Sequence, residues 1–185
     1  NTPSDEVNEA VAEHTWALIL ALARRIVESD EAVRRGGYKG WEPDIFIGVN
    51  IIGKTLGIVG LGRIGSMVAR RAKGYNMTVL YNKHDPDPEA EKELGVTFAS
   101  LAELLAKSDF VSLHVPLTDE TRHMINKETL AKMKKGSFLI NTARGPIVDE
   151  RDLVEALKSG HLAGVALDVF DNEPNIDPEF LAMPN

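Results

Sequence analysis

The sequence contains no cysteine, which excludes disulfide bonds, thiolate catalysis and metal sites with cysteine ligands. Basic residues are also few: 21 lysines and arginines stand against 28 aspartates and glutamates, giving a formal net charge of -7. This balance argues against a general surface for nucleic acid or anionic membranes, so any phosphate site must be local. We assign no metal site to the sequence.

Long hydrophobic runs are absent as well. The longest, residues 16–23, is far shorter than the roughly 20 residues of a membrane span. The first ten residues lack the basic segment and the apolar centre of a secretory signal, so we expect a cytoplasmic protein. A length of 185 residues with 43% hydrophobic content suits one domain with a sizeable core and is short for two.

Residues 4–35 are free of proline and glycine and rich in alanine, leucine, glutamate and arginine. They predict one long helix that could break near Ser29. Its middle, "WALILALARRI", is apolar nearly all round, so it must be covered on more than one side, either within a larger protein or at a subunit interface. An ordinary core helix fits this pattern equally well.

From residue 54 onward, short apolar runs alternate with helical segments. The continuous apolar runs predict strands buried on both faces, as in a parallel sheet covered by helices. We therefore predict one doubly wound α/β domain of Rossmann type, with its core in residues 54–185. The expected strands lie at 55–60, 77–81, 109–115, 137–142 and 164–170. The expected helices lie at 64–73, 89–94, 101–107, 127–134 and 150–159.

The motif "GLGRIG" places Gly60, Gly62 and Gly65 in the pattern G-x-G-x-x-G, between a predicted strand and a predicted helix. The first glycine permits a tight turn, the second lets backbone approach a pyrophosphate, and the third lets the helix pack closely on the strand. In this context the motif favours dinucleotide binding, although a glycine-rich turn can also serve packing alone.

Ligands of open α/β sheets bind at the carboxyl ends of the strands, where residues 142–146, Asp168 and Glu173 are expected. An arginine there, Arg144, could hold a carboxylate or a polarised carbonyl in a bidentate grip. Glu173 could orient and charge a histidine. A surface arginine, a helix-capping aspartate and a solvated glutamate remain the structural alternatives.

Four stretches carry a family resemblance: "NTPS", "GKTLGIVGLGRIG", "INTARGPIVDE" and "LVEALKSGHLAGVALDVFDNEP". Over nearly the whole chain they resemble the D-isomer-specific 2-hydroxyacid dehydrogenases. The run from "FIGVNIIGKTLG" to "RAKGYNMTVLY" is most similar to glyoxylate and hydroxypyruvate reductases within that family.

The resemblance implies an oxidoreductase that passes a hydride between a nicotinamide cofactor, NAD or NADP, and a small 2-oxo or 2-hydroxy acid. Arg144 would hold the carboxylate and carbonyl of the acid, and Glu173 would pair with a catalytic histidine. Further residues would surround the cofactor: Gly60, Gly62, Arg63, Ile64 and Gly65 at the pyrophosphate, Val115 and Pro116 on the adenosine side, and Thr142, Ala143 and Asp168 at the nicotinamide.

The sequence departs from the family where its histidine is expected. That histidine follows a proline in the family, and none of the five histidines here does so. The flanking substrate domain is also missing, so the chain resembles a cofactor domain alone. We expect it to bind dinucleotide but to turn over 2-oxo acids very poorly. The apolar first helix resembles the family's dimer-forming segment, which implies a homodimer.

Asn82 lies 22 positions after Gly60, where the dinucleotide fingerprint expects an acidic residue on the ribose 2′-hydroxyl. An uncharged side chain would not repel a 2′-phosphate, and Lys83 would add a cation. The sequence thus favours NADP(H). The alternative is that Asn82 serves only the turn and that NAD binds through its ribose.

Other functions remain open at this point. Some members of this fold family are dinucleotide-sensing corepressors, and a methyltransferase could also carry a glycine-rich loop after its first strand. Glyoxylate, hydroxypyruvate, phosphohydroxypyruvate (the substrate of a phosphoglycerate dehydrogenase) and larger 2-oxo acids are all compatible substrates.

Overall fold

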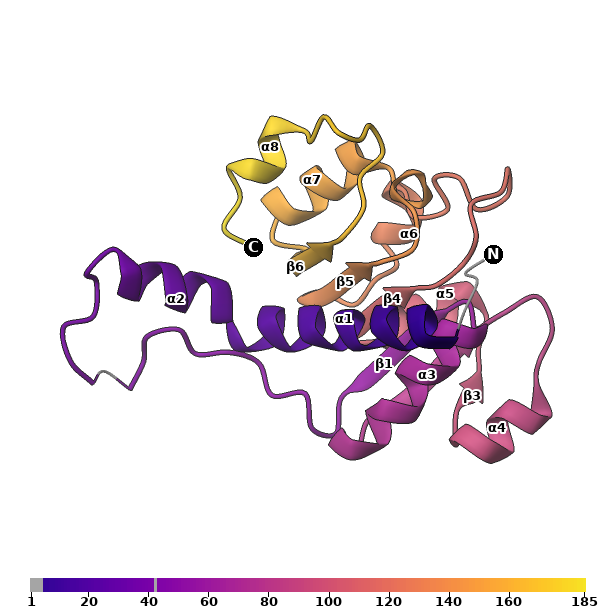
Figure 1. The fold of residues 1–185 in the computed structure, drawn as a ribbon. Helices are drawn as coiled ribbons and strands as arrows, with labels where there is room; N and C mark the ends of the chain where they lie inside the picture. Colours follow the sequence, from indigo (N-terminus) through magenta and orange to yellow (C-terminus); the bar gives the residue numbers. More distant parts are fainter. Residues whose placement is uncertain (1–4, 42) are drawn as a thin grey trace.

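A computed structural model describes residues 5–41 and 43–185. Ser4, where the first helix was expected to begin, and the rest of the "NTPS" stretch lie outside the described residues. Six parallel strands form a single sheet in the order β3-β2-β1-β4-β5-β6 (Figure 1). The strands are β1 (Thr55–Val59), β2 (Thr78–Asn82), β3 (Thr97–Phe98), β4 (Phe110–Leu113), β5 (Ser137–Asn141) and β6 (Leu162–Leu167).

The strand order reverses between β1 and β4, which lie side by side with Val59 opposite Leu113. At such a reversal the connections from two neighbouring strands leave toward opposite faces of the sheet. The carboxyl ends of β1 and β4 are therefore where an open α/β sheet of this kind is expected to bind a ligand. The predicted doubly wound fold is confirmed.

Helices cover both faces of the sheet. The α-helices are α1 (Asp5–Arg24), α2 (Ile26–Arg34), α3 (Arg63–Ala72), α4 (Pro88–Leu94), α5 (Leu101–Lys107), α6 (Lys127–Leu130), α7 (Glu150–Lys158) and α8 (Pro178–Leu181). Two short 3₁₀ turns, η1 (Lys73–Tyr75) and η2 (Gly145–Ile147), complete the set.

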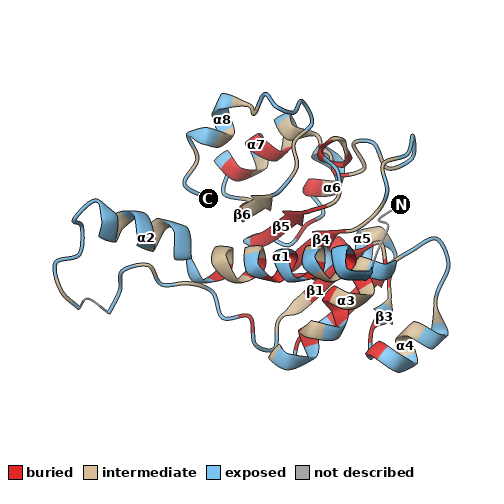
Figure 2. Ribbon diagram, viewed as in Figure 1, coloured by how far each residue is buried: buried red, intermediate tan, exposed pale blue. Residues whose placement is uncertain are grey.

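Each face of the sheet has its own apolar core. Leu56 and Ile58 of β1 pack with α1 and α3 on one side, whereas Val59 packs with α5, α6 and α7 on the other. The strands are therefore buried on both faces, which is why they appear in the sequence as continuous apolar runs. Figure 2 shows β5 coloured as buried along its length. Tyr81 and Phe110 are among the fully buried side chains.

The first helix is broken at Arg25, so the prediction of a break near Ser29 was wrong in its position. Arg25 adopts a left-handed conformation with φ 53°. The cause lies in a distant segment: the backbone N–H of Val49 donates to the carbonyl oxygen of Ala23 at 2.7 Å. That carbonyl would otherwise accept the next bond of the helix, so α1 ends and α2 leaves in a new direction.

The segment from α2 to residue 50 extends away from the sheet as an arm (Figure 1). We define this arm as residues 26–41 and 43–50. Its apolar side chains are largely exposed, including Ile26, Val27, Val33, Tyr38 and Trp41. No helix within the described residues is long and apolar enough to cross a membrane.

The remaining element predictions were close to the structure. The third predicted helix starts at Leu101, where the Ser100 hydroxyl accepts the Glu103 N–H at 3.3 Å. The predicted helix at 127–134 is shorter and ends at Leu130. The two-residue strand β3 and the single-turn helix α8 were missed.

Candidate functional site

The glycine loop begins at Gly60, directly after β1. Its N–H donates to the carbonyl oxygen of Asn82 at 2.9 Å, so the loop is tied to the end of β2. A β-carbon at Gly60 would lie 2.7 Å from the His114 carbonyl and 2.9 Å from a Val115 methyl group. With φ 99°, the position also demands glycine. The loop is thereby held against the chain that leaves β4.

Gly62 and Gly65 differ in what surrounds them. A β-carbon at Gly65 would collide with the carbonyl oxygen of Gly60, so this glycine lets α3 pack against β1. A β-carbon at Gly62 would meet no protein atom within 4 Å. The space beside Gly62 is therefore open, as is required where backbone approaches a bound phosphate.

The N-terminal turn of α3 also leaves room for an anion. Among the described residues, no side chain caps this helix, which begins at Arg63 with Gly62 as its N-cap residue. Side chains do cap the other helices that follow the glycine loop: Asp87 on α4, Ser100 on α5, Asn126 on α6, Asp149 on α7 and Asp177 on α8. The first N–H groups of α3, including those of Arg63 and Ile64, are available to an anion, and the helix dipole favours one there.

A second group of candidate residues lies where β5 and β6 end side by side, at the carboxyl edge of the sheet. The N–H of Asp168 donates to the carbonyl oxygen of Asn141 at 3.0 Å, which places Thr142 and Asp168 on neighbouring strand ends. The Asn141 side chain organises the turn that follows, since it accepts the Ala143 N–H at 3.1 Å and donates to the Arg144 carbonyl at 2.9 Å. The predicted residues Thr142, Ala143 and Asp168 thus lie together.

Two residues that sequence reasoning treated only as parts of a packing helix also reach this edge. His14 Nε2 lies 3.3 Å from Asp168 Oδ1, and the hydroxyl of Thr15 lies 3.0 Å from the hydroxyl of Thr142. The sequence feature that could have identified them is that His14 and Thr15 are polar and directly precede the apolar run starting at Trp16.

The turn that carries Arg144 packs against the loop that carries Glu173. A β-carbon at Gly145 would collide with the backbone of Phe170, so the two segments touch. The N–H of Phe170 in turn donates to Glu173 Oε1 at 2.8 Å. Arg144 is exposed and donates to the Ala143 carbonyl, and within residues 5–41 and 43–185 no carboxylate pairs with its guanidinium. The guanidinium is therefore available to an external carboxylate.

The polar side chains at the end of β2 already have partners within the protein, which the sequence did not indicate. Asn82 Nδ2 donates to the carbonyl oxygen of Ala99 at 3.0 Å. Lys83 Nζ pairs with Asp87 Oδ2 at 2.8 Å, and this contact lowers the pKa of the Asp87 carboxyl below its ordinary value. The cation expected to meet a 2′-phosphate is thus already matched by a carboxylate of the same turn.

His114 lies at the end of β4, beside the glycine loop. Burial lowers the pKa of its imidazole to about 4, so the ring is neutral at pH 7. Its Nε2 lies 2.9 Å from the Ser112 hydroxyl. A half-buried, neutral imidazole that bonds within the protein favours a packing role for this residue over a role as a proton donor.

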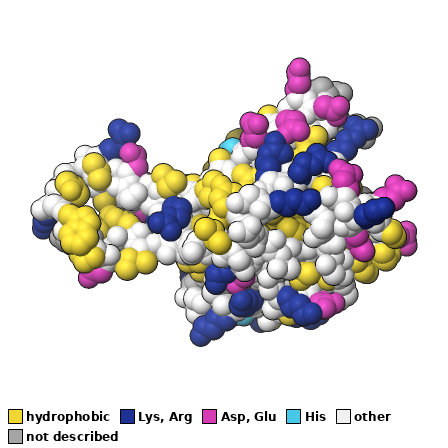
Figure 3. All heavy atoms as spheres, turned by 90° about the horizontal axis from the view of Figure 1, so that it is seen from below, with side chains coloured by type: hydrophobic (Ala, Val, Ile, Leu, Met, Phe, Trp, Pro, Cys, Tyr) yellow, Lys and Arg dark blue, Asp and Glu magenta, His cyan; other side chains and the backbone are white. Residues whose placement is uncertain are grey.

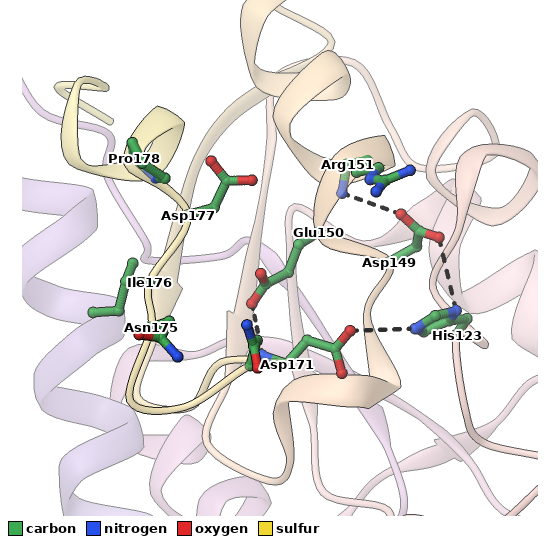
Figure 4. A pocket seen from close by; sticks show the side chains of 10 residues that line it. His123, Asp149, Glu150, Arg151, Asp171, Asn175, Ile176, Asp177 and Pro178 are labelled. Carbon is green, nitrogen blue, oxygen red and sulfur yellow. Dashed lines mark hydrogen bonds and ion pairs between the residues drawn. The ribbon is translucent and has the colours of Figure 1, made fainter.

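A cavity of about 530 Å³ lies away from the glycine loop, between the start of α7 and the loop after β6 (Figure 4). Its lining includes His123, Asp149, Glu150 and Asp171. His123 lies between two carboxylates, 3.7 Å from Asp149 and 3.8 Å from Asp171. Asp149 already caps α7, and Glu150 accepts the Asp171 N–H at 2.8 Å. These contacts join α7 to the loop of Glu173.

None of the described residues form a cluster of histidines and carboxylates suited to a metal ion.

Comparison with known proteins identifies the fold as that of a specific family. The family model described as "D-isomer specific 2-hydroxyacid dehydrogenase, NAD binding domain" matches residues 16–185. The chain belongs to this family. The resemblance predicted from the glycine, "INTARGP" and "LDVFDNEP" motifs is confirmed, and the domain is one that binds a nicotinamide cofactor.

Relatives of this NAD-binding domain include reductases of 2-oxo acids. A glyoxylate reductase of Thermococcus kodakarensis is 50% identical over 189 residues, which cover 100% of this chain and 56% of that protein. The crystal structure of a Thermus thermophilus protein matches with a TM-score of 0.92 at 48% identity, covering 100% of this chain and 57% of the other. A glyoxylate reductase from Paecilomyes thermophila matches with a TM-score of 0.90 at 42% identity, covering 99% and 54%. The chain therefore spans little more than half the length of these relatives.

Proposed function

We propose that this chain is the cofactor half of a reductase that converts a small 2-oxo acid, of the glyoxylate or hydroxypyruvate type, into a D-2-hydroxy acid. The observation that carries the proposal is the arrangement of the glycine loop at the carboxyl ends of β1 and β4. There Gly60 presses against His114 and Val115, the space beside Gly62 is open, and α3 begins without a side-chain cap. These features fit a pyrophosphate and leave room for a dinucleotide along the edge of the sheet.

We infer the following roles for the predicted residues of the cofactor site. The loop residues Gly60, Gly62, Arg63, Ile64 and Gly65 would hold the pyrophosphate, Val115 and Pro116 would line the adenosine side, and Thr142, Ala143 and Asp168 would hold the nicotinamide. Asp168 would accept a hydrogen bond from the carboxamide. The exposure of Asp168 beside Thr142 supports this role.

The nicotinamide supplies the hydride when the cofactor is bound. Arg144 would grip the carboxylate of the 2-oxo acid and stabilise the negative charge that develops on its carbonyl oxygen. Glu173 would orient a histidine acid and raise its pKa, so that the imidazolium can protonate that oxygen. We place this histidine and the substrate-binding domain in the part of the intact protein that lies outside this chain.

For the form of the cofactor, we propose that the site accepts NADP(H) because Asn82 puts no charge against a 2′-phosphate. To contact that phosphate, Lys83 would first have to break its ion pair with Asp87, which reduces what the lysine can add to the affinity for NADPH. Exchanging the carboxylate should release the lysine. Asp87→Asn keeps an N-cap residue on α4 but removes the charged partner.

Paired titrations of the purified chain with NADH and NADPH test this proposal. Asp87→Asn should strengthen NADPH binding about 3-fold or more, an effect that salt reduces, and should leave NADH binding unchanged. Asn82→Asp should weaken NADPH binding relative to NADH by about 10-fold, because it places a carboxylate beside the phosphate. If neither variant shifts the ratio of the two affinities, the proposed role of the turn is wrong.

Activity is tested with glyoxylate and hydroxypyruvate. Since the proposed acid and substrate domain lie elsewhere, the 185-residue chain should oxidise NAD(P)H at least about 100-fold more slowly than the intact protein. A chain that binds neither NADH nor NADPH would contradict the proposal at its first step. Activity of the intact protein on phosphohydroxypyruvate instead of glyoxylate would leave the cofactor site in place and change the substrate class.

We further propose that the protein forms a homodimer through the arm. Its exposed apolar side chains lie on one protruding element, where they can meet the same surface of a second copy (Figure 3).

A further inference from the structure

Two consecutive residues of α1 contact two residues that we assign to the nicotinamide. Thr15 is fully buried and lies 3.0 Å from the Thr142 hydroxyl, while His14 lies 3.3 Å from Asp168. Asp168 and Thr142 belong to different strand ends, so α1 joins both through adjacent positions. A helix that served only to cover the sheet would need apolar residues there, as it has at Ala12, Trp16 and Ile19.

The protons of this cluster can be followed from the hydrogen bonds. The Thr15 hydroxyl donates to the carbonyl oxygen of Val11 at 2.8 Å. A hydroxyl has a single proton, so toward Thr142 the Thr15 oxygen can only accept, and Thr142 must be the donor. The Thr142 oxygen therefore keeps its lone pairs for another partner.

Asp168 is left in a similar state. An ionised carboxylate only accepts hydrogen bonds, and His14 Nε2 approaches one of its two oxygens, Oδ1. Oδ2 is not used in this contact. The two neighbouring strand ends thus offer oxygen acceptors, which match the two N–H groups of a primary carboxamide.

We propose that His14 and Thr15 are positioning residues that fix Asp168 and Thr142 as acceptors for the carboxamide of the nicotinamide. The inference rests on the proposed cofactor site and adds to it a source of specificity. It requires a ligand whose amide donates, and it disfavours a carboxylate at the same place. The role is indirect, since neither α1 residue touches the ligand.

The test compares ligands with and without the nicotinamide, bound to the purified chain. NADH carries the group and ADP-ribose does not. His14→Leu should weaken NADH binding about 3- to 10-fold and change ADP-ribose binding less than about 2-fold. His14→Gln, whose amide N–H can reach the same carboxylate, should restore NADH binding to within about 2-fold of the wild type. Thr15→Val should act like His14→Leu, and Thr15→Ser should restore binding.

A second readout concerns the chemistry of the ligand. Wild-type chain should prefer NAD⁺ over nicotinic acid adenine dinucleotide, whose carboxylate cannot donate to the two acceptors. His14→Leu should reduce this preference several-fold, because the acceptors are no longer held. His123→Leu is the matched control: this histidine also lies near carboxylates, Asp149 and Asp171, but it is not on α1, and its loss should leave the preference unchanged.

The outcomes separate this inference from the proposed function. If the wild-type chain binds neither NADH nor ADP-ribose, the proposed cofactor site fails and the inference falls with it. If the wild-type chain binds both, and His14→Leu weakens both equally or neither, only the inference is overturned. Loss of folding in His14→Leu, detected by thermal denaturation, leaves His14→Gln as the deciding variant: wild-type preference for NAD⁺ with it supports the inference, and lost preference contradicts it.

Discussion

Burial holds His114 in its neutral form, and this has a consequence for stability. The pKa of His114 is about 4 in the folded protein, against an ordinary value of 6.5. Between these values the unfolded chain binds a proton that the folded chain does not, so stability rises with pH in this window. The stability is complete above pH 6.5 and is lost as the pH falls toward 4.

Replacement of His114 should therefore flatten the pH dependence of unfolding. The histidine accounts for about 3 kcal/mol of the fall in unfolding free energy between about pH 7 and pH 4. His114→Gln cannot take up this proton, and its amide can still meet the Ser112 hydroxyl. Urea denaturation of both proteins at several pH values measures the difference, and other titrating groups cancel in the comparison. Parallel curves for the two proteins would contradict the assignment.

At the scale of elements, two glycines between β1 and α3 have different roles. Gly65 is needed for packing, whereas Gly62 faces the proposed ligand site. Gly65 lies against the Gly60 carbonyl and Ile58, whereas the space beside Gly62 is empty of protein atoms. Gly65→Ala should lower the unfolding free energy by about 1–3 kcal/mol, because either α3 or the loop must move. Gly62→Ala should cost less than about 1 kcal/mol, as expected for an N-cap exchange.

Cofactor binding should follow the opposite pattern at Gly62. Its added methyl group would enter the space assigned to the pyrophosphate, so Gly62→Ala should weaken NADH binding about 10-fold or more while the protein stays folded. Denaturant titration and NADH titration of the same samples measure the two effects. Normal binding by Gly62→Ala would show that the open space is not the phosphate site.

The sequence predicted an element well where neighbouring residues determine it. It predicted less well where contacts with a distant segment determine the bounds of an element or the surroundings of a residue. Five of the six strands and the glycine loop follow from patterns of neighbouring residues, and these were predicted. The end of α1 depends on Val49, which is far along the chain from Ala23, and no local pattern marks Arg25 as the break. The contacts of His14 and Thr15 with the ends of β5 and β6 likewise exist only once the sheet is assembled.

The position of Lys83 shows the same limit within the candidate site. The sequence correctly places a cation at the end of β2, but its partner Asp87 comes from the turn that starts α4. Both charges were visible in the sequence, whereas their distance was not. On our proposal, the choice between NAD and NADP would depend on whether Asp87 or a 2′-phosphate pairs with Lys83, and only the folded turn shows that these two partners compete.

At the scale of the whole molecule, the arm is the feature that the rest of the fold does not explain. Most large apolar side chains pack into the two cores, yet Ile26, Val27, Val33 and Trp41 are between 50% and 83% exposed on one projecting segment. Such a surface is costly in water unless a partner covers it. The same argument applies to aggregation, which the chain would risk if the arm stayed open.

Charge placed on the arm should therefore separate the proposed dimer into monomers. We expect the wild-type chain to sediment as a dimer at micromolar concentration and the double variant Val27→Glu/Val33→Glu to sediment as a monomer. Both side chains are more than half exposed in the single chain, so the substitutions should leave the monomer folded. Leu181→Glu on α8 is the matched control, because it changes an apolar residue at least as exposed but outside the arm. A monomeric wild-type chain, or a double variant that remains dimeric, would show that the arm does not hold two copies together.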